Sequence, residues 1–144
     1  MKKTLLSALL SASLICTNPL SSHGSAEGAM FRARQILDVL LDQGWTVNRV
    51  YDKGFLARGQ SINIFVTLNA GVRYKLVVGG CEDAIDVDAA LYDENGNLIS
   101  RDRDSSSLAI VDVIPTWTGP FILRVTMYDS QPNGAHFVVQ YAWD

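Results

Sequence analysis

The densest group of reactive side chains in this sequence is acidic. Its members are Glu82, Asp83, Asp86, Asp88, Asp93, Glu94, Asp102 and Asp104. Clusters of carboxylate oxygens are what a hard cation such as Ca²⁺ requires. One hypothesis is therefore a calcium site, and its predicted ligands are Asp86, Asp88, Asp93 and Asp102.

A solvated acidic surface is the competing interpretation of the same stretch. Arg101 and Arg103 lie among the carboxylates and can pair with some of them. Segment 93–97 also departs from the EF-hand calcium loop, where glycine comes sixth, because Gly96 is the fourth residue here. A hairpin turn at Asn95 and Gly96 explains this segment without a metal, since both residue types tolerate positive φ.

Paired carboxylates also raise the question of catalysis. On a strand, Asp86 and Asp88 would lie on one face, about 7 Å apart. Glycoside hydrolysis uses two carboxyl groups, but one of them needs a raised pKa in an apolar cleft, and crowded acids beside arginines give no sign of one. His136 is the only histidine beyond residue 26, which excludes a zinc site with several histidines. A non-catalytic protein is favoured, and a hydrolase is the alternative.

Aromatic side chains suggest a second kind of ligand. By their alternation along the chain, Tyr92 and Tyr128 are predicted to point outward, and Trp117 falls in a turn. Such side chains can stack on the apolar C–H edges of sugar rings. These three residues are therefore the predicted ligand-binding positions of a carbohydrate-binding module, whereas Tyr141 and Trp143 are predicted to point into the core.

The first 26 residues read as a secretory signal peptide. Lys2 and Lys3 precede an apolar run over 5–15, and the small residues Gly24 and Ala26 suit a signal peptidase. The apolar run is shorter than the roughly 20 residues that span a bilayer. We therefore expect export to the periplasm or the extracellular space, with cleavage after Ala26.

Cleavage at that position would change the charge and the cysteine content. Loss of two lysines leaves ten basic residues against fifteen acidic ones, a net charge near −5. That charge argues against partners such as nucleic acid or an anionic membrane surface. Cys81 would remain as a lone thiol, which excludes an intramolecular disulfide, and we expect it to be buried.

The remaining sequence predicts one helix followed by strands. Apolar residues recur at helical spacing over 27–44, and Gly44 suits the end of that helix. From residue 45 onward the period changes to two, with short turn segments between the alternating runs. The alternating runs are 62–68, 72–78, 85–91, 121–128 and 136–143. Seven or eight short strands predict an all-β, antiparallel, jelly-roll-like β-sandwich over 45–144, with the helix docked on it.

The spacing of turn and core residues resembles the bacterial pre-peptidase C-terminal domain. The matching segments are Leu68 to Tyr74, Asp86 to Asp93, Asn95 to Ile99, Asp102, and Thr118 to Val125. The resemblance is greater to small stand-alone exported proteins of that type that carry an N-terminal helix. It implies a secreted β-sandwich without catalytic activity, and it covers about two thirds of the chain beyond residue 26.

These observations favour a non-catalytic exported module that binds another protein or a cell-envelope component such as a glycan. A carbohydrate- or calcium-binding module is the alternative, and a hydrolase is the less favoured one. No cofactor other than Ca²⁺ is suggested by the residues, and no membrane span is predicted.

Overall fold

The computed structural model describes residues 24–48 and 50–144. The predicted signal peptide lies almost entirely outside the described residues, so its cleavage stays a prediction. Within the described part, Ser25 caps the N-terminus of the helix, and its side chain accepts a hydrogen bond from the Gly28 N–H. The described residues contain no helix with the length and hydropathy of a membrane span.

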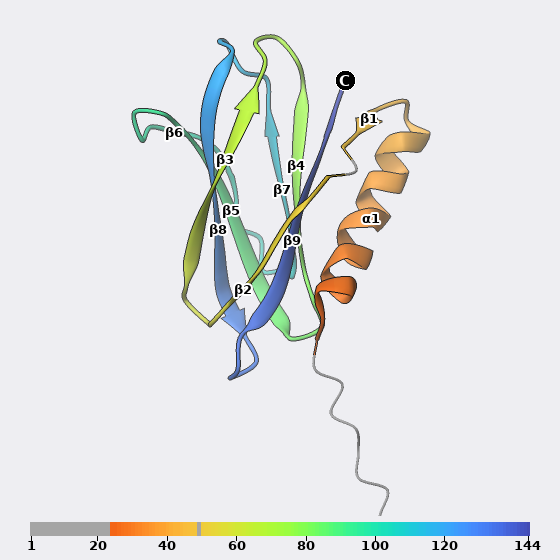
Figure 1. Ribbon diagram of the computed structural model, residues 1–144, viewed down its shortest axis with the longest axis vertical. Coiled ribbons are helices and arrows are strands. Elements are labelled where there is room, and N and C mark those ends of the chain that lie inside the picture. The colour runs from red at the N-terminus through yellow and green to blue at the C-terminus, as the bar shows by residue number, and fades with distance from the viewer. Residues whose placement is uncertain (1–23, 49) are drawn as a thin grey trace, which may run out of the picture.

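Two antiparallel sheets pack face to face, which confirms the predicted sandwich (Figure 1). The four-stranded sheet has the order β3-β8-β5-β6, and its strands are β3 Ser61–Leu68, β8 Gly119–Ser130, β5 Ala84–Asp93 and β6 Leu98–Asp102. The five-stranded sheet has the order β1-β9-β4-β7, with β2 also paired to β9. Its strands are β1 Thr46–Val47, β2 Asp52–Leu56, β4 Tyr74–Gly80, β7 Leu108–Val113 and β9 Ala135–Trp143.

The described chain has nine strands, against the seven or eight predicted. Two of them, β1 and β2, are short and carry little of the two-residue alternation that marks the longer strands. Both pair with β9, β1 near its C-terminal end and β2 near its N-terminal end. Their strand character therefore depends on the partner strand rather than on their own sequence.

Helix α1 (Ala26–Asp42) docks on the five-stranded sheet as predicted. It lies along β4 and β9, on the side away from the other sheet (Figure 1). Gly44 follows the helix with a φ of +91°, which fits its predicted role at the helix end.

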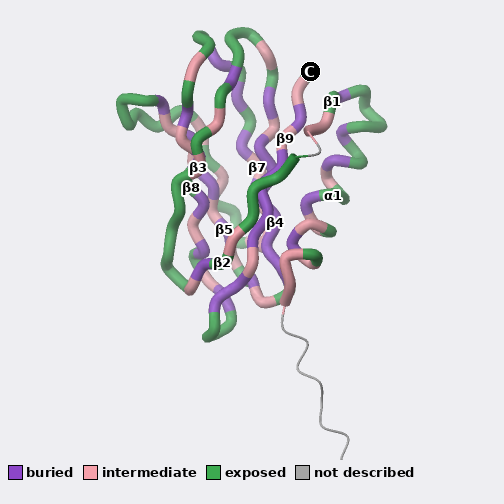
Figure 2. The backbone as a smooth tube through the Cα atoms, viewed as in Figure 1, coloured by how far each residue is buried: buried purple, intermediate pink, exposed green. Residues whose placement is uncertain are grey.

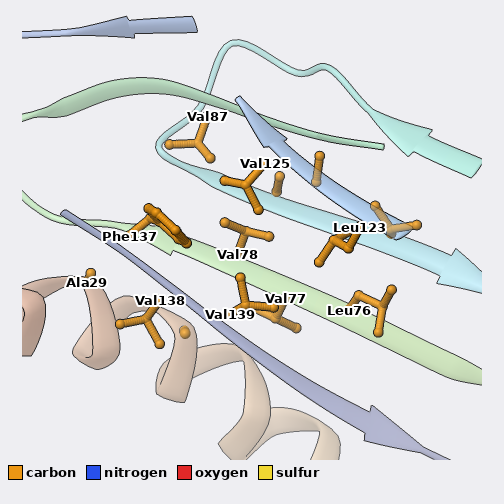
Figure 3. Close-up of a cluster of buried hydrophobic side chains, with 14 of the residues drawn as sticks. Ala29, Leu76, Val77, Val78, Val87, Leu123, Val125, Phe137, Val138 and Val139 are labelled. Atoms are coloured by element: carbon orange, nitrogen blue, oxygen red, sulfur yellow. The ribbon is translucent and has the colours of Figure 1, made fainter. Parts of the chain in front are cut away.

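The core lies between the two sheets, where every second residue of the longer strands points inward. On β8 these are Phe121, Leu123, Val125 and Met127, all fully buried as their alternation predicted. Figure 3 shows Val125 of β8 near Val78 of β4, with Phe137 of β9 on one side and Leu123 on the other. In Figure 2 the buried residues of these strands are drawn in purple.

Strand β9 corrects one expectation. Alternation alone would place Val138, Gln140 and Ala142 on a solvent face, but all three are buried because α1 covers that face. The same alternation places His136 on this outer face, and the structure has it half-buried there. Tyr141 and Trp143, predicted as core residues, are only partly buried and pack against the core edge.

The helix approaches the sheet closely because small residues meet there. A Cβ atom on Gly79 of β4 would lie 2.5 Å from the Ala29 carbonyl oxygen and 3.2 Å from the Ala33 Cβ. Cys81, just beyond β4, is fully buried as predicted, and its Sγ accepts a hydrogen bond from the His136 N–H. The outer face of the five-stranded sheet is therefore occupied along β4 and β9.

Candidate functional site

The outer face of the four-stranded sheet carries a groove of about 550 Å³. Its walls include Asp86, Asp88, Tyr92, Arg103, Arg124 and Tyr128. No helix lies on this face in the described part of the chain (Figure 1). Two residues from the calcium hypothesis and two from the carbohydrate hypothesis therefore meet at a single place.

Strand register explains why these side chains come together. Outward residues of β5 and β8 are neighbours, with Asp88 opposite Thr126 and Ala90 opposite Arg124. Ala90 has the smallest side chain in this array, so it forms a low floor between larger neighbours. The groove thus arises because a short side chain lies among long ones, while the pairing of β5 with β8 continues beneath it.

Arg124 is held in place at one wall of the groove. Its guanidinium carbon lies 5.1 Å from the centre of the Tyr92 ring, a cation–π arrangement. Its Nε donates a hydrogen bond of 3.0 Å to the Asn63 side-chain oxygen on β3. A guanidinium fixed in this way is preorganised to receive an acidic or carbonyl group.

The opposite wall is acidic and partly shielded from water. Burial raises the pKa of Asp88, the charge of Asp86 raises it further, and Arg103 opposes both effects. Oδ1 of Asp86 is buried and accepts no hydrogen bond from any described residue. These carboxylates therefore lie in a recess, whereas one of the two interpretations of the sequence placed them on a solvated acidic surface.

The other two predicted calcium ligands lie elsewhere. Asp93 is 6% exposed in the β5–β6 turn, where its carboxylate accepts hydrogen bonds from the Asn95 and Asn97 N–H groups and from Asn97 Nδ2. These bonds, led by those of Asn97, lower the pKa of Asp93. Asp102 points from β6 toward the other sheet, where its Oδ2 accepts from the Ile110 N–H at 2.8 Å.

The four predicted ligands are thus divided among three places. In the described ranges 24–48 and 50–144, no three side chains of His, Cys, Asp or Glu stand close enough together to hold a metal ion. Calcium binding by Asp86, Asp88, Asp93 and Asp102 as one set stays a prediction, and only the first two share the groove.

The three predicted aromatic positions also lie in two different places. Tyr92 and Tyr128 line the groove, and Tyr128 is 64% exposed. Trp117 lies outside the groove lining and stacks on Phe121, with 5.1 Å between the ring centres. Two of the three predicted ligand-binding residues therefore share a site.

Sequence reasoning missed Arg103, Arg124, Ser61 and Thr126 as members of this site. The outward position of Arg124 and Thr126 on β8 was available from alternation. What alternation does not give is the strand order β3-β8-β5-β6, because the neighbouring strands come from distant parts of the chain.

A second cavity, of about 530 Å³, lies beside α1 near β1. Leu37 and Leu41 of the helix line it together with Gln140 of β9. Gln140 is only 3% exposed, and its Oε1 accepts no hydrogen bond from the described residues. This cavity belongs to the interface between the helix and the sheet, and it holds fewer charged groups than the groove.

Comparisons with known proteins add one finding on the fold. No family model matches the chain, and no curated protein matches it. The solved structure of a periplasmic inhibitor of g-type lysozyme, PliG of Aeromonas hydrophila, is similar with a TM-score of 0.51. The two chains share 14% identity over 71% of this chain and 90% of that one, a likeness that shows the fold alone. Similarity to the pre-peptidase C-terminal domain stays a prediction.

Proposed function

We propose that this chain is an exported, non-catalytic protein that binds a lysozyme through the groove on the outer face of its four-stranded sheet. The observation that carries the proposal is the composition of that groove, where Tyr92, Tyr128, Arg103 and Arg124 surround Ala90. Tyrosine and arginine are among the residue types that contribute most of the binding energy at protein interfaces. A partner side chain or loop can enter above Ala90 and meet both signs of charge.

Two features support a protein as the ligand. Arg124 already lies over the face of Tyr92, so that ring is less open to a stacked sugar. The groove carries positive charge on Arg103 and Arg124 and negative charge on Asp86 and Asp88, which suits the mixed charges of a protein surface. A cell-envelope glycan is the second candidate, favoured by the exposed ring of Tyr128 beside those carboxylates.

The groove also supports a role without catalysis. Asp86 and Asp88 project from one strand, so both would contact a bound sugar from the same side instead of flanking its glycosidic bond. His136 lies on the covered face of the other sheet, where its ring packs against Phe55 at 5.0 Å. No imidazole among the described residues therefore lies near the carboxylate pair.

The choice of lysozyme as partner class rests on the similar fold. PliG is a periplasmic inhibitor of g-type lysozyme, so its partner is itself a protein. A periplasmic location would place this chain where it could meet a lysozyme that attacks the cell wall. Periplasm is accordingly the location that we propose, in preference to the extracellular space.

The test is an assay of a purified g-type lysozyme acting on peptidoglycan, together with calorimetry of the two proteins. We expect inhibition by the wild-type protein and at least about tenfold weaker binding for Arg124→Glu, because a buried interface charge is reversed. Arg34→Glu on the exposed surface of α1 makes the same charge change and should leave binding within about twofold.

Two results would contradict the proposal. One is the absence of binding to g-type lysozyme at millimolar concentrations of either protein. The other is equal weakening by Arg124→Glu and Arg34→Glu, which would place the interface outside the groove. Binding to purified peptidoglycan fragments that is lost in Tyr128→Ala would favour the glycan candidate instead.

A further inference from the structure

Strand β3 forms one edge of the four-stranded sheet. Among the described residues it pairs only with β8, over Ser61–Leu68, so no described strand occupies its other edge (Figure 1). Five of its eight residues are exposed, and its segment is drawn mostly green in Figure 2. Phe65 is 76% exposed, the highest value for a large apolar side chain in the described chain.

Other strand edges in the described chain carry the usual protection against pairing with another molecule. Strand β6 is five residues long and carries Arg101 and Asp102. On β7 the Ile110 N–H is already taken by the Asp102 carboxylate. Strand β2 is also short and begins with Asp52 and Lys53. Charged residues, short strands and covering groups are how proteins prevent edge-to-edge association.

Strand β3 has none of these devices. Its sequence from Ser61 to Leu68 contains no charged residue and no proline, and its pairing with β8 contains no bulge. Its eight residues include three β-branched apolar side chains, Ile62, Ile64 and Val66, which favour strand pairing. An edge of this kind is a template for a further strand.

The hydrogen-bond pattern between β3 and β8 determines which backbone groups of β3 point to the open edge of the sheet. The Met127 N–H donates to the Gln60 carbonyl, so the backbone groups of Gln60 point toward β8. In an antiparallel pair, the backbone groups of successive residues point alternately toward and away from the partner strand. Ile62, Ile64 and Val66 then direct their backbone groups toward β8. Those of Ser61, Asn63, Phe65 and Thr67 point to the open edge.

We propose that β3 pairs antiparallel with β3 of a second copy of this chain. A two-fold axis at Phe65 would place Phe65 opposite its own copy and Asn63 opposite Thr67. On the core side, Ile64 would lie opposite Val66, and Ile62 opposite Leu68. The strand is complementary to itself because apolar residues meet apolar ones and no charge meets a like charge.

This pairing would join two four-stranded sheets into one of eight strands. The groove contacts β3 only at Ser61, near one end of the strand, so it would stay open in the dimer. The inference is therefore independent of the proposed function. Phe65→Lys should leave lysozyme inhibition unchanged, because Phe65 does not line the groove, and Arg124→Glu should leave the oligomeric state unchanged.

Sedimentation of the purified protein between about 1 µM and about 1 mM tests the pairing. We expect a dimer that dissociates on dilution. Phe65→Lys should raise the dissociation constant at least about tenfold, because two positive charges would face each other at the axis. Phe31→Lys is the matched control, since Phe31 is 64% exposed on α1, and it should still dimerise.

A second variant tests the backbone bonds separately from the side chains. Asn63→Pro removes one N–H from the open edge and should also weaken the dimer, while circular dichroism verifies that the sandwich persists. A wild-type protein that stays monomeric up to about 1 mM would overturn the proposal. So would a dimer that persists unchanged in both Phe65→Lys and Asn63→Pro.

Discussion

The outer faces of the two sheets differ in the size of their side chains, and therefore in whether a helix can pack on them. Along β4 and β9, the outward residues include Gly79, Val138 and Ala142, and α1 lies directly on them. Along β5 and β8, the outward residues include Tyr92 and Arg124, and no helix among the described residues covers them. Small side chains permit close packing, whereas long polar ones keep other elements away.

This contrast shows how one fold can separate stability from binding. The covered face adds a third layer to the hydrophobic core and leaves few groups for a ligand. The open face keeps its tyrosines, arginines and carboxylates in contact with water. A substitution should therefore damage folding on the covered face and binding on the open face.

The largest expected effect comes from Gly79→Leu on the covered face. The new Cβ would lie 2.5 Å from the Ala29 carbonyl oxygen, which is backbone and cannot move aside without displacing α1. We expect a loss of about 3 kcal/mol or more in the free energy of unfolding, measured by urea denaturation.

The matched variant on the open face is Ala90→Leu. Ala90 lies on the floor of the groove, so the larger side chain fills space that is open to solvent. Its free energy of unfolding should stay within about 0.5 kcal/mol of the wild type, while lysozyme binding is lost. Similar destabilisation by both variants would contradict the contrast between the two faces.

A smaller loss of stability is expected from Asp93→Ala at the end of β5. Its carboxylate accepts three hydrogen bonds from Asn95 and Asn97, so truncation leaves these donors without a partner and should lower the Tm by several degrees. The folded state lowers the pKa of Asp93, so its stabilisation is complete above the ordinary value of about 4 and is lost at lower pH.

Thermal unfolding between about pH 2 and about pH 7 checks this prediction. The difference in Tm between Asp93→Asn and the wild type should shrink as pH falls below the ordinary pKa of an aspartate. A difference that stays constant over the whole range would show that the charge of Asp93 does not stabilise the turn.

The smallest effect is expected from Asp88→Asn in the groove. This variant should raise the Tm, whereas Asp93→Ala should lower it. Burial and Asp86 raise the pKa of Asp88, so the folded protein binds the proton more tightly than the unfolded chain does. The wild type should therefore lose stability as pH rises through this pKa. Asn carries no charge that must be buried beside Asp86, so Asp88→Asn should raise the Tm at about pH 7 and change it little at about pH 3. Asp104→Asn, on the exposed loop after β6, is the control.

Alternation predicted much of the fold because the core has one dominant face per strand. The inward residues of β8 are buried as their period indicated, and α1 occupies nearly the predicted range. On β5, Val87, Ala89 and Leu91 are buried as predicted, but Ile85 is 48% exposed, because the pairing with β8 shifts register beside it. Prediction failed on β9, where Val138, Gln140 and Ala142 are buried by a helix about 100 residues away in sequence. Burial by a distant element leaves only an indirect trace, the small residues Gly79 and Ala142.

The candidate site was predictable only in pieces. Asp86, Asp88, Tyr92 and Tyr128 stood out by residue type and outward position, whereas Arg124 did not. Asp93 and Asp102 resembled the other acids in sequence, yet local hydrogen bonds occupy both. Whether a carboxylate is free or engaged depends on donors that only the folded chain brings near it.

The sequence by itself determined which side chains face outward on β5 and β8, because side-chain direction follows from the two-residue period of a strand. It also determined which residues are small enough for α1 to approach the sheet. The strand order β3-β8-β5-β6 was decided only by the tertiary structure. Strand order arises from pairing between distant segments, and that pairing placed Arg124 beside Ala90 and Tyr92 and left β3 at an open edge.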